Sequence, residues 1–494
     1  MAMRGRLAAN ALAGALAVAG FAPVGAWPLS WLALCVLFAS LAGAPSARAG
    51  FALGYAWGLG FFLAGVSWIY VSLHVYGGMS MGLAALATFL FCAFLALFPA
   101  VAAGAVARMP GRARRLLLAA PLAWAFMEWV RGWIFTGFPW LGMGYTQVPN
   151  GLFAAYAPVV GVYGVSTLLV FSASASVWLL TSPVPLKHRT AVAVSLLVLA
   201  AGGWGLRWVD WTHPEGVPTR ISLLQGNVPQ DLKWQPAATR DTLANYARLA
   251  AGAPAQLIIF PETALPLFES DLPESYREGL NALGQKNQGD LLVGLPTGRL
   301  DGDYFNSVVS FGTAPSQRYH KSHLVPFGEY IPQKALWGWV LDVLSIPLSD
   351  FARGAPDQPP LAVGGQRVAM NICYEDAFGE EIIRALPEAT VLANVSNLAW
   401  FGDSFAPWQH AQMSQMRALE TGRMMVRATN TGLTAIIDHK GRILDALPLF
   451  ETGALTGDVQ GRAGATPYVR VGNALILSVW LGLAAALVAF RQRS

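Results

Sequence analysis

The sequence is poor in charged residues and in cysteine. Only 12% of its 494 residues are Asp, Glu, Lys or Arg, whereas 54% are hydrophobic, and its mean hydropathy is +0.45. Soluble domains carry about 25% charged residues, so this composition excludes an ordinary soluble protein and indicates contact with a lipid bilayer. The three cysteines, Cys35, Cys92 and Cys373, are too few for a disulfide-rich scaffold.

The few charges are unevenly distributed along the chain. Residues 212–465 hold 19 Lys and Arg against 26 Asp and Glu, and the remainder holds 14 against two, Glu128 and Asp210. The basic excess lies at the ends of apolar runs, so the pI of about 9.1 does not indicate a nucleic-acid partner. We expect transmembrane helices one to seven in 1–211, a globular domain in 212–465, and an eighth helix with a tail in 466–494.

Eight apolar runs are about long enough to span a bilayer. They lie near 7–24, 28–45, 50–71, 81–104, 115–135, 158–181, 190–209 and 471–490. The Lys and Arg residues of the connecting loops fall on one side if both termini are cytoplasmic, which places the acidic domain outside the cytoplasm. The first run has an alternative interpretation as a cleaved signal peptide, although further apolar runs follow it at once.

The acidic domain alternates β-rich runs with helical patterns, which predicts an α/β fold in which helices bury a sheet. The expected strands are 220–228, 256–262, 290–296, 306–312, 367–375, 390–397 and 433–439. The expected helices are 236–252, 273–287, 377–386 and 405–424.

Cys373 is the first candidate for chemistry. It ends the apolar run of "AMNICYED" and is the only cysteine of the acidic domain, so it has no disulfide partner there. A lone thiol outside the cytoplasm is a liability that requires a reason, and a nucleophile would supply one. The alternative is a buried structural cysteine, which is common in protein cores.

Two further segments favour the nucleophile. In "IIFPETALP", Glu262 ends an apolar strand and is a candidate general base whose pKa burial would raise. In "RYHKSHLVPFGEYIP", Lys321 is a cation suited to hold a developing oxyanion, and Glu329 follows it. With such partners Cys373 need not be a resting thiolate, because its proton can leave as the sulfur attacks.

These residues resemble the Glu–Lys–Cys triad of the carbon–nitrogen hydrolase (nitrilase) superfamily. The surrounding apolar spans narrow the resemblance to its membrane-embedded branch, the apolipoprotein N-acyltransferase family. The segments that carry this narrower resemblance are "GNVPQDLKW", "HLVPFGEY", "ICYE" and "AWFGDSFAPWQHAQMSQMRALETGR". The chain departs from the family pattern at Leu398, where an Asp is usual.

The resemblance implies an extracytoplasmic αββα sandwich in a multi-pass protein of the bacterial inner membrane, with the catalytic domain on the periplasmic side. It implies transfer of an acyl chain from a phospholipid, with phosphatidylethanolamine as the expected donor, to the α-amino group of a diacylated apolipoprotein. We expect no cofactor, no metal and a monomer. The implied catalytic residues are Glu262 as base, Lys321 as oxyanion donor and Cys373 as nucleophile. The implied supporting residues are Trp234, Asn306, Glu329, Tyr374, Glu375, Trp400 and Phe401.

Other features leave alternatives open. The apolar stretch 330–351 is either a mobile arm that dips into lipid or a segment packed under the fold. The pair Glu128 and Arg131 suits an ion pair or a lipid headgroup. His320 and His323 are poorly spaced for one metal on a strand. His410 is either structural or substrate-facing.

Two other classes of function compete with acyl transfer. A membrane-anchored amidase or nitrilase that hydrolyses a small C–N substrate would share the triad but would need a closed polar pocket for water. A transporter or scaffold would place charged residues along a path through the membrane and would not need Cys373. The charges within the spans are few and lie near the ends, which disfavours this third class.

Overall fold

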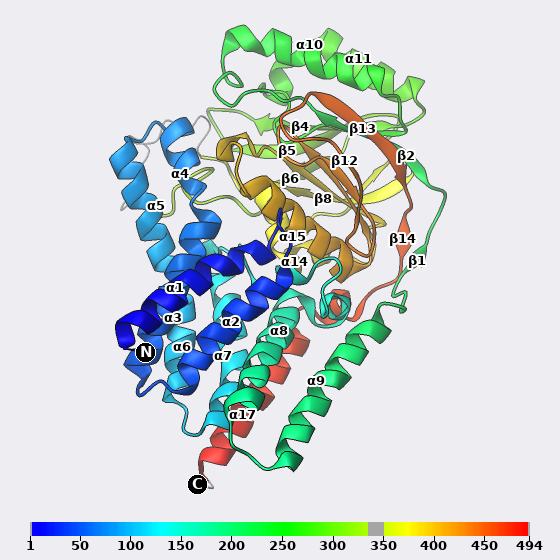
Figure 1. Cartoon of the computed structure of the whole chain (residues 1–494). Coiled ribbons are helices and arrows are strands. Elements are labelled where there is room, and N and C mark those ends of the chain that lie inside the picture. The colour runs from blue at the N-terminus through cyan, green and yellow to red at the C-terminus, as the bar shows by residue number, and fades with distance from the viewer. Residues whose placement is uncertain (1, 334–349, 493–494) are drawn as a thin grey trace. The chain divides into compact units, whose positions relative to one another are not determined.

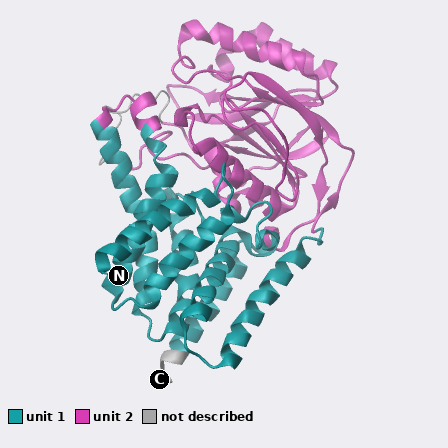
Figure 2. Cartoon of the chain, viewed as in Figure 1, with its two compact units in different colours: residues 1–70, 82–210, 470–494 teal, residues 71–81, 211–469 magenta. Residues whose placement is uncertain are grey.

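The computed structural model describes residues 2–333 and 350–492 (Figure 1). The chain divides into two compact units (Figure 2). The first unit holds residues 1–70, 82–210 and 470–494, and the second holds residues 71–81 and 211–469. No pattern in the sequence indicated that 71–81 would group with the acidic domain.

The first unit is helical. Its main helices are α1 (Met3–Ala17), α2 (Trp27–Ala42), α3 (Ala47–Val66), α5 (Met81–Leu95), α6 (Leu97–Arg108), α7 (Ala120–Arg131), α8 (Ala157–Thr181), α9 (Leu186–Leu206) and α17 (Ala474–Gln492). In the part of the chain that the structure describes, four helical stretches are long and apolar enough to cross a membrane, namely Ala47–Val66, Met81–Arg108, Ala154–Thr181 and Leu186–Leu206. The expectation of eight spans therefore stays a prediction.

Small residues bring α3 close to α6. Gly50, Gly54 and Gly58 recur every four residues and so lie on one face of α3. A Cβ atom added at Gly54 would lie 2.5 Å from both the Cβ of Ala103 and the carbonyl oxygen of Pro99. This spacing of small residues is the usual means by which apolar helices approach closely in membranes.

The second unit contains two six-stranded sheets. One has the order β12-β11-β10-β9-β8-β7, and the other has the order β13-β2-β3-β4-β5-β6. The strands of the first sheet are β7 (Leu361–Val363), β8 (Gln366–Ile372), β9 (Val391–Ser396), β10 (Met424–Thr429), β11 (Ala435–Ile437) and β12 (Ile443–Ala446). Those of the second are β2 (Thr219–Gln225), β3 (Leu257–Ile259), β4 (Asp290–Gly298), β5 (Tyr304–Gly312), β6 (Arg318–His320) and β13 (Gly453–Val459). A short pair, β1 (His213–Pro214) and β14 (Arg462–Ala463), forms a separate ribbon.

The sheets pack face to face between helices, which confirms the αββα sandwich. Alternate residues of the strands, such as Leu223 in β2 and Met370 in β8, share one core between the sheets. Residues of opposite parity pack on helices: Leu224 and its neighbours contact α10 (Pro236–Gly252) and α11 (Glu274–Lys286), and Leu392 lies in the core with α15 (Ala406–Thr421). Both faces of the inner strands β3, β4, β9 and β10 are buried, as is typical of a sheet that is covered on both sides.

Several expected elements differ from the structure. The expected helix 377–386 is only the single turn α14 (Gly379–Ile382) followed by the 3-10 turn η9 (Ile383–Ala385). The expected helix 405–424 ends at Thr421, because Gly422 adopts a left-handed conformation and β10 begins two residues later. Strands β6, β7, β10, β12 and β13 were not predicted, since they are short or lack clear alternation.

Candidate active site

Glu262 follows β3 and is buried, with 7% of its surface exposed. One carboxylate oxygen accepts hydrogen bonds from the Asn306 side chain at 2.7 Å and from Lys321 Nζ at 3.4 Å. The other accepts one from the backbone N–H of Asn397 at 2.8 Å. Burial acts to raise the pKa of Glu262, but Lys321, Lys233 and these hydrogen bonds lower it below its usual value. The expectation of a raised pKa was therefore wrong, because it considered burial without the cations.

Lys321 follows β6 and is 1% exposed. Its Nζ lies 2.9 Å from Glu329 Oε1 and 3.4 Å from Glu262 Oε1, and Asn306 donates to both carboxylates. Burial acts to lower the pKa of Lys321, but the charges of Glu329 and Glu262 outweigh it and keep the pKa above its usual value. The structure thus brings together one ammonium, two carboxylates and an amide.

Cys373 begins the 3-10 turn η8 (Cys373–Ala377), directly after β8. Its φ of +55° is left-handed, which is unusual for a residue other than glycine, and such strain gathers at functional sites. Two donors hold its carbonyl oxygen, since Asn394 Nδ2 and His410 Nε2 each lie 3.0 Å away. Burial and the charge of Glu262 raise the pKa of the thiol well above its usual value, and Lys321 offsets part of this rise.

This raised pKa predicts a thiol that reacts slowly at neutral pH. In a Cys35→Ala/Cys92→Ala background, we expect alkylation of Cys373 by iodoacetamide to accelerate about tenfold per pH unit between about pH 7 and pH 9, since only the thiolate reacts. Mass spectrometry of timed samples measures the rate. A plateau at neutral pH would reveal a resting thiolate and contradict the prediction.

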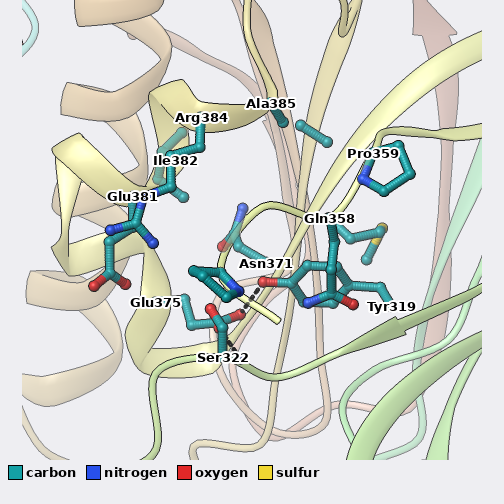
Figure 3. A pocket seen from close by; sticks show the side chains of 13 residues that line it. Tyr319, Ser322, Gln358, Pro359, Asn371, Glu375, Glu381, Ile382, Arg384 and Ala385 are labelled. Carbon is teal, nitrogen blue, oxygen red and sulfur yellow. Dashed lines mark hydrogen bonds between the residues drawn. The ribbon is translucent and has the colours of Figure 1, made fainter. Parts of the chain in front are cut away.

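Glu375 forms a second carboxylate centre, separate from Glu262 and Glu329. One oxygen accepts from the N–H and Oγ of Ser322 and the N–H of His323, and the other accepts from the Tyr319 hydroxyl and the Ile372 N–H. Figure 3 shows Tyr319 and Ser322 converging on this carboxylate in the wall of a small pocket. Glu375 therefore ties the segment after β6, which carries Lys321, to the turn that carries Cys373.

The remaining predicted residues lie in the loop before α10 and in the turns η8 and η10 (Ala399–Phe401). Trp234 lies two residues before α10 and is partly buried, and Tyr374 is buried beside Cys373. Trp400 and Phe401 lie in the turn η10, where the ring of Trp400 meets Tyr76 edge to face with centroids 6.1 Å apart. Of the expected apolar arm 330–351, residues 334–349 lie outside the described residues.

Four other residues of the sequence analysis have defined environments. Leu398 is 1% exposed and packs against Gly432, so its side chain lies inside the fold. His320 Nδ1 contacts Ser307 Oγ at 2.7 Å, whereas His323 Nδ1 contacts Glu381 at 3.0 Å, so the two rings have different partners. Glu128 Oε1 accepts from the Trp124 indole N–H and the Met143 N–H.

Comparison with known proteins covers nearly the whole chain. Residues 13–175 match the apolipoprotein N-acyltransferase N-terminal domain, and residues 220–468 match the carbon-nitrogen hydrolase family. The apolipoprotein N-acyltransferase of Nitrosomonas europaea is 49% identical over 495 residues, which cover 99% of this chain and 98% of the relative. The chain belongs to the apolipoprotein N-acyltransferase family.

Other relatives agree with this assignment. The apolipoprotein N-acyltransferase of Chromobacterium violaceum is 45% identical, with 98% of this chain and 92% of the relative covered. Among solved structures, an amidase from Nesterenkonia sp. matches with a TM-score of 0.38 and 20% identity, covering 55% of this chain and 98% of that one. The matched family models and the curated relatives confirm the family resemblance stated from the sequence motifs.

The chain also contains buried charged residues whose contacts were not predicted from the sequence. Lys233 in "GNVPQDLKW" is 3% exposed, and its Nζ donates to the carbonyl oxygen of Glu262 at 3.2 Å. Asp376 in "CYED" is fully buried, with Arg427 NH1 2.9 Å and His410 Nε2 2.7 Å away. Lys233 lies in a loop without periodicity, and Asp376 and Arg427 are 51 residues apart, so the sequence offered no signal for either contact.

Proposed function

We propose that this chain transfers a fatty acyl group from a membrane phospholipid to the α-amino group of the N-terminal S-diacylglyceryl cysteine of apolipoproteins. The observation that carries the proposal is the buried cluster of Lys321, Glu262 and Glu329 beside the strained turn at Cys373. It occurs in a chain that is 49% identical to a relative bearing the name of this activity.

In the first half-reaction the sulfur of Cys373 attacks the ester carbonyl carbon of the phospholipid. The thiol proton passes to Glu262, which its neighbouring cations keep ionised and ready to accept it. The ester C–O bond then breaks, and the lysophospholipid leaves as an alcohol after taking the proton from Glu262. The acyl group remains on Cys373 as a thioester.

The oxyanion that develops on the substrate would be held by Lys321 and by the backbone N–H of Tyr374. A trans peptide directs its C=O and N–H in opposite directions. Because Asn394 and His410 hold the carbonyl of Cys373 on one side, the N–H of Tyr374 in the same peptide points to the other. This arrangement supports an oxyanion site on the side opposite His410.

In the second half-reaction the uncharged α-amino group attacks the thioester carbon and gives a proton to Glu262. The C–S bond breaks, an amide forms, and the thiolate of Cys373 regains that proton. Asn306 and Glu329 keep Lys321 and Glu262 in place, and Glu375 fixes the turn at Cys373. Trp234 would flank the substrate, and Trp400 and Phe401 would contact the acyl chain. No step requires a metal or a cofactor.

The proposed substrates indicate the cellular location of the protein. Both are lipids, so we place the protein in the bacterial inner membrane, in agreement with its apolar helices. Residues 212–465 would form the periplasmic catalytic domain, 1–211 and 466–494 would carry eight spans, and both termini would be cytoplasmic. Phosphatidylethanolamine is the proposed donor, and the monomer is the proposed functional unit.

The test is mass spectrometry of the purified chain incubated with phosphatidylethanolamine. We expect a mass gain of one fatty acyl group that hydroxylamine removes and that Cys373→Ala lacks. Addition of a diacylated lipopeptide should discharge the adduct and yield the triacylated product. A folded protein that gains no adduct but hydrolyses small amides would replace this proposal with the anchored amidase.

A further inference from the structure

Lys233 is a buried cation to which the mechanism above gives no role of its own. It lies in the loop between β2 and α10, is 3% exposed, and donates to the carbonyl oxygen of Glu262 at 3.2 Å. An ammonium group carries a positive charge and three hydrogen-bond donors. Burying such a group costs free energy unless a nearby negative charge compensates it. The position of Lys233 beside the candidate base therefore needs an electrostatic explanation.

The charged groups around Lys233 supply one. It interacts electrostatically with Glu262, which follows β3, and with Cys373, which begins η8. Lys321 and Glu329 complete the group around Glu262, whereas Asp231 of the loop itself is exposed. The two carboxylates Glu262 and Glu329 are thus balanced by two ammonium groups, and without Lys233 they would outnumber Lys321.

We propose that Lys233 is a positioning residue for acyl transfer. Its charge, together with that of Lys321, balances Glu262 and Glu329 in the resting site and balances Glu329 and the thiolate once the proton has passed to Glu262, and its hydrogen bond fixes the Glu262 peptide. This inference rests on the proposed function. Negative charge near a thiol opposes its ionisation, and a nearby cation favours it. After the proton has passed to Glu262, the negative groups are the thiolate and Glu329. Lys321 alone would leave this site with a net negative charge, and Lys233 removes that excess. Lys233 also keeps Glu262 ionised in the resting site.

The charge of Lys233 depends on pH in an accessible range. Burial lowers the pKa of Lys233 to about 8, although Glu262 and Cys373 act against this change. The positive charge is therefore present at neutral pH and is lost as the pH rises through about 8. The rate of thioester formation should fall over the same range, because both carboxylates then face Lys321 alone.

The experiment measures the rate of thioester formation by the full chain in micelles that contain phosphatidylethanolamine, from about pH 6.5 to about pH 9.5. Lys233→Gln keeps an N–H donor for the Glu262 carbonyl but removes the charge. Lys233→Arg keeps the charge to high pH. Lys286→Met, at the exposed end of α11, is the matched control.

We expect Lys233→Gln to lower the saturating rate by about 10- to 100-fold at neutral pH while the KM for phospholipid stays within about twofold. Lys233→Arg should retain activity. Its rate of thioester formation should begin to fall at a higher pH than that of the wild type. The control should match the wild type at every pH.

Three results would overturn the inference: a wild-type rate in Lys233→Gln, equal losses in folded Gln and Arg variants, or a wild-type rate that climbs through pH 8. If Lys233→Gln does not fold, Lys233→Arg still tests the inference. A rate that falls at the same pH in Lys233→Arg as in the wild type would contradict the proposed role. A wild-type protein that forms no thioester at all would remove the proposed function itself, and the inference with it.

Discussion

Replacing Glu262 by glutamine is expected to slow formation of the Cys373 thioester by about 10³-fold at neutral pH. Glutamine has the same shape as glutamate, and its oxygen can still accept from Lys321 or Asn397, but it cannot take the thiol proton. Loss of a positioned general base costs about 10² to 10⁴ in rate. Stopped incubation with phosphatidylethanolamine followed by mass spectrometry gives the rate constant.

The same substitution should accelerate alkylation of Cys373 by iodoacetamide. The charge of Glu262 raises the pKa of the thiol, so its removal lowers that pKa and increases the thiolate fraction at neutral pH. Acyl transfer and alkylation would thus change in opposite directions. Glu274→Gln, in which an exposed carboxylate on α11 is lost, serves as the control and should alter neither rate. A fall of both rates together would assign Glu262 a purely structural role.

The helices and strands that could be predicted well from the sequence are those with a clear pattern of apolar and polar residues. Helix α10 has the predicted bounds, and α11 differs by one residue at each end, because both have a polar face and an apolar face. The central strands, such as β4, were found as apolar runs between turn residues. Short strands at the sheet edges and the turn after Cys373 depend on tertiary contacts, and local sequence does not encode them.

In the candidate site, too, some features could be predicted from the sequence and others could not. Glu262, Lys321 and Cys373 stand out because each is a reactive residue at the end of a strand-like run. Their environments could not be predicted, since Asn306, Asn397 and Lys233 come from separate segments that meet only in the fold. The pKa of Glu262 illustrates the consequence, because its direction reverses once the cations around the carboxylate are known. Residue types suggested the chemistry, and spatial neighbours set the charge states.

Replacing Arg427 by methionine is expected to destabilise the second unit by about 3–5 kcal/mol. Arg427 and Asp376 are both 0% exposed and lie 2.9 Å apart, and Arg427 also donates to His410 Nδ1 at 3.0 Å and to Ser414. Burial acts to raise the pKa of Asp376, yet His410 and Arg427 hold it below its usual value. Without Arg427, Asp376 loses its permanent positive partner in the core.

We expect the apparent melting temperature to fall by roughly 10 °C. Tryptophan fluorescence, recorded at the same heating rate for every variant, measures this temperature. Arg220→Met is the matched control, because Arg220 and Asp458 are 52% and 61% exposed and such surface pairs contribute little. A melting temperature equal to that of the control would contradict the prediction.

A double variant separates stability from catalysis. Arg427→Met combined with Asp376→Leu removes both buried charges, and apolar replacement of a buried ion pair is often neutral, so the melting temperature should recover. Thioester formation should nevertheless be slower than in the wild type, because the ring of His410 then lacks the two partners that direct Nε2 toward the carbonyl of Cys373. A double variant that recovers both stability and rate would mean that this buried cluster supports the fold without orienting the Cys373–Tyr374 peptide.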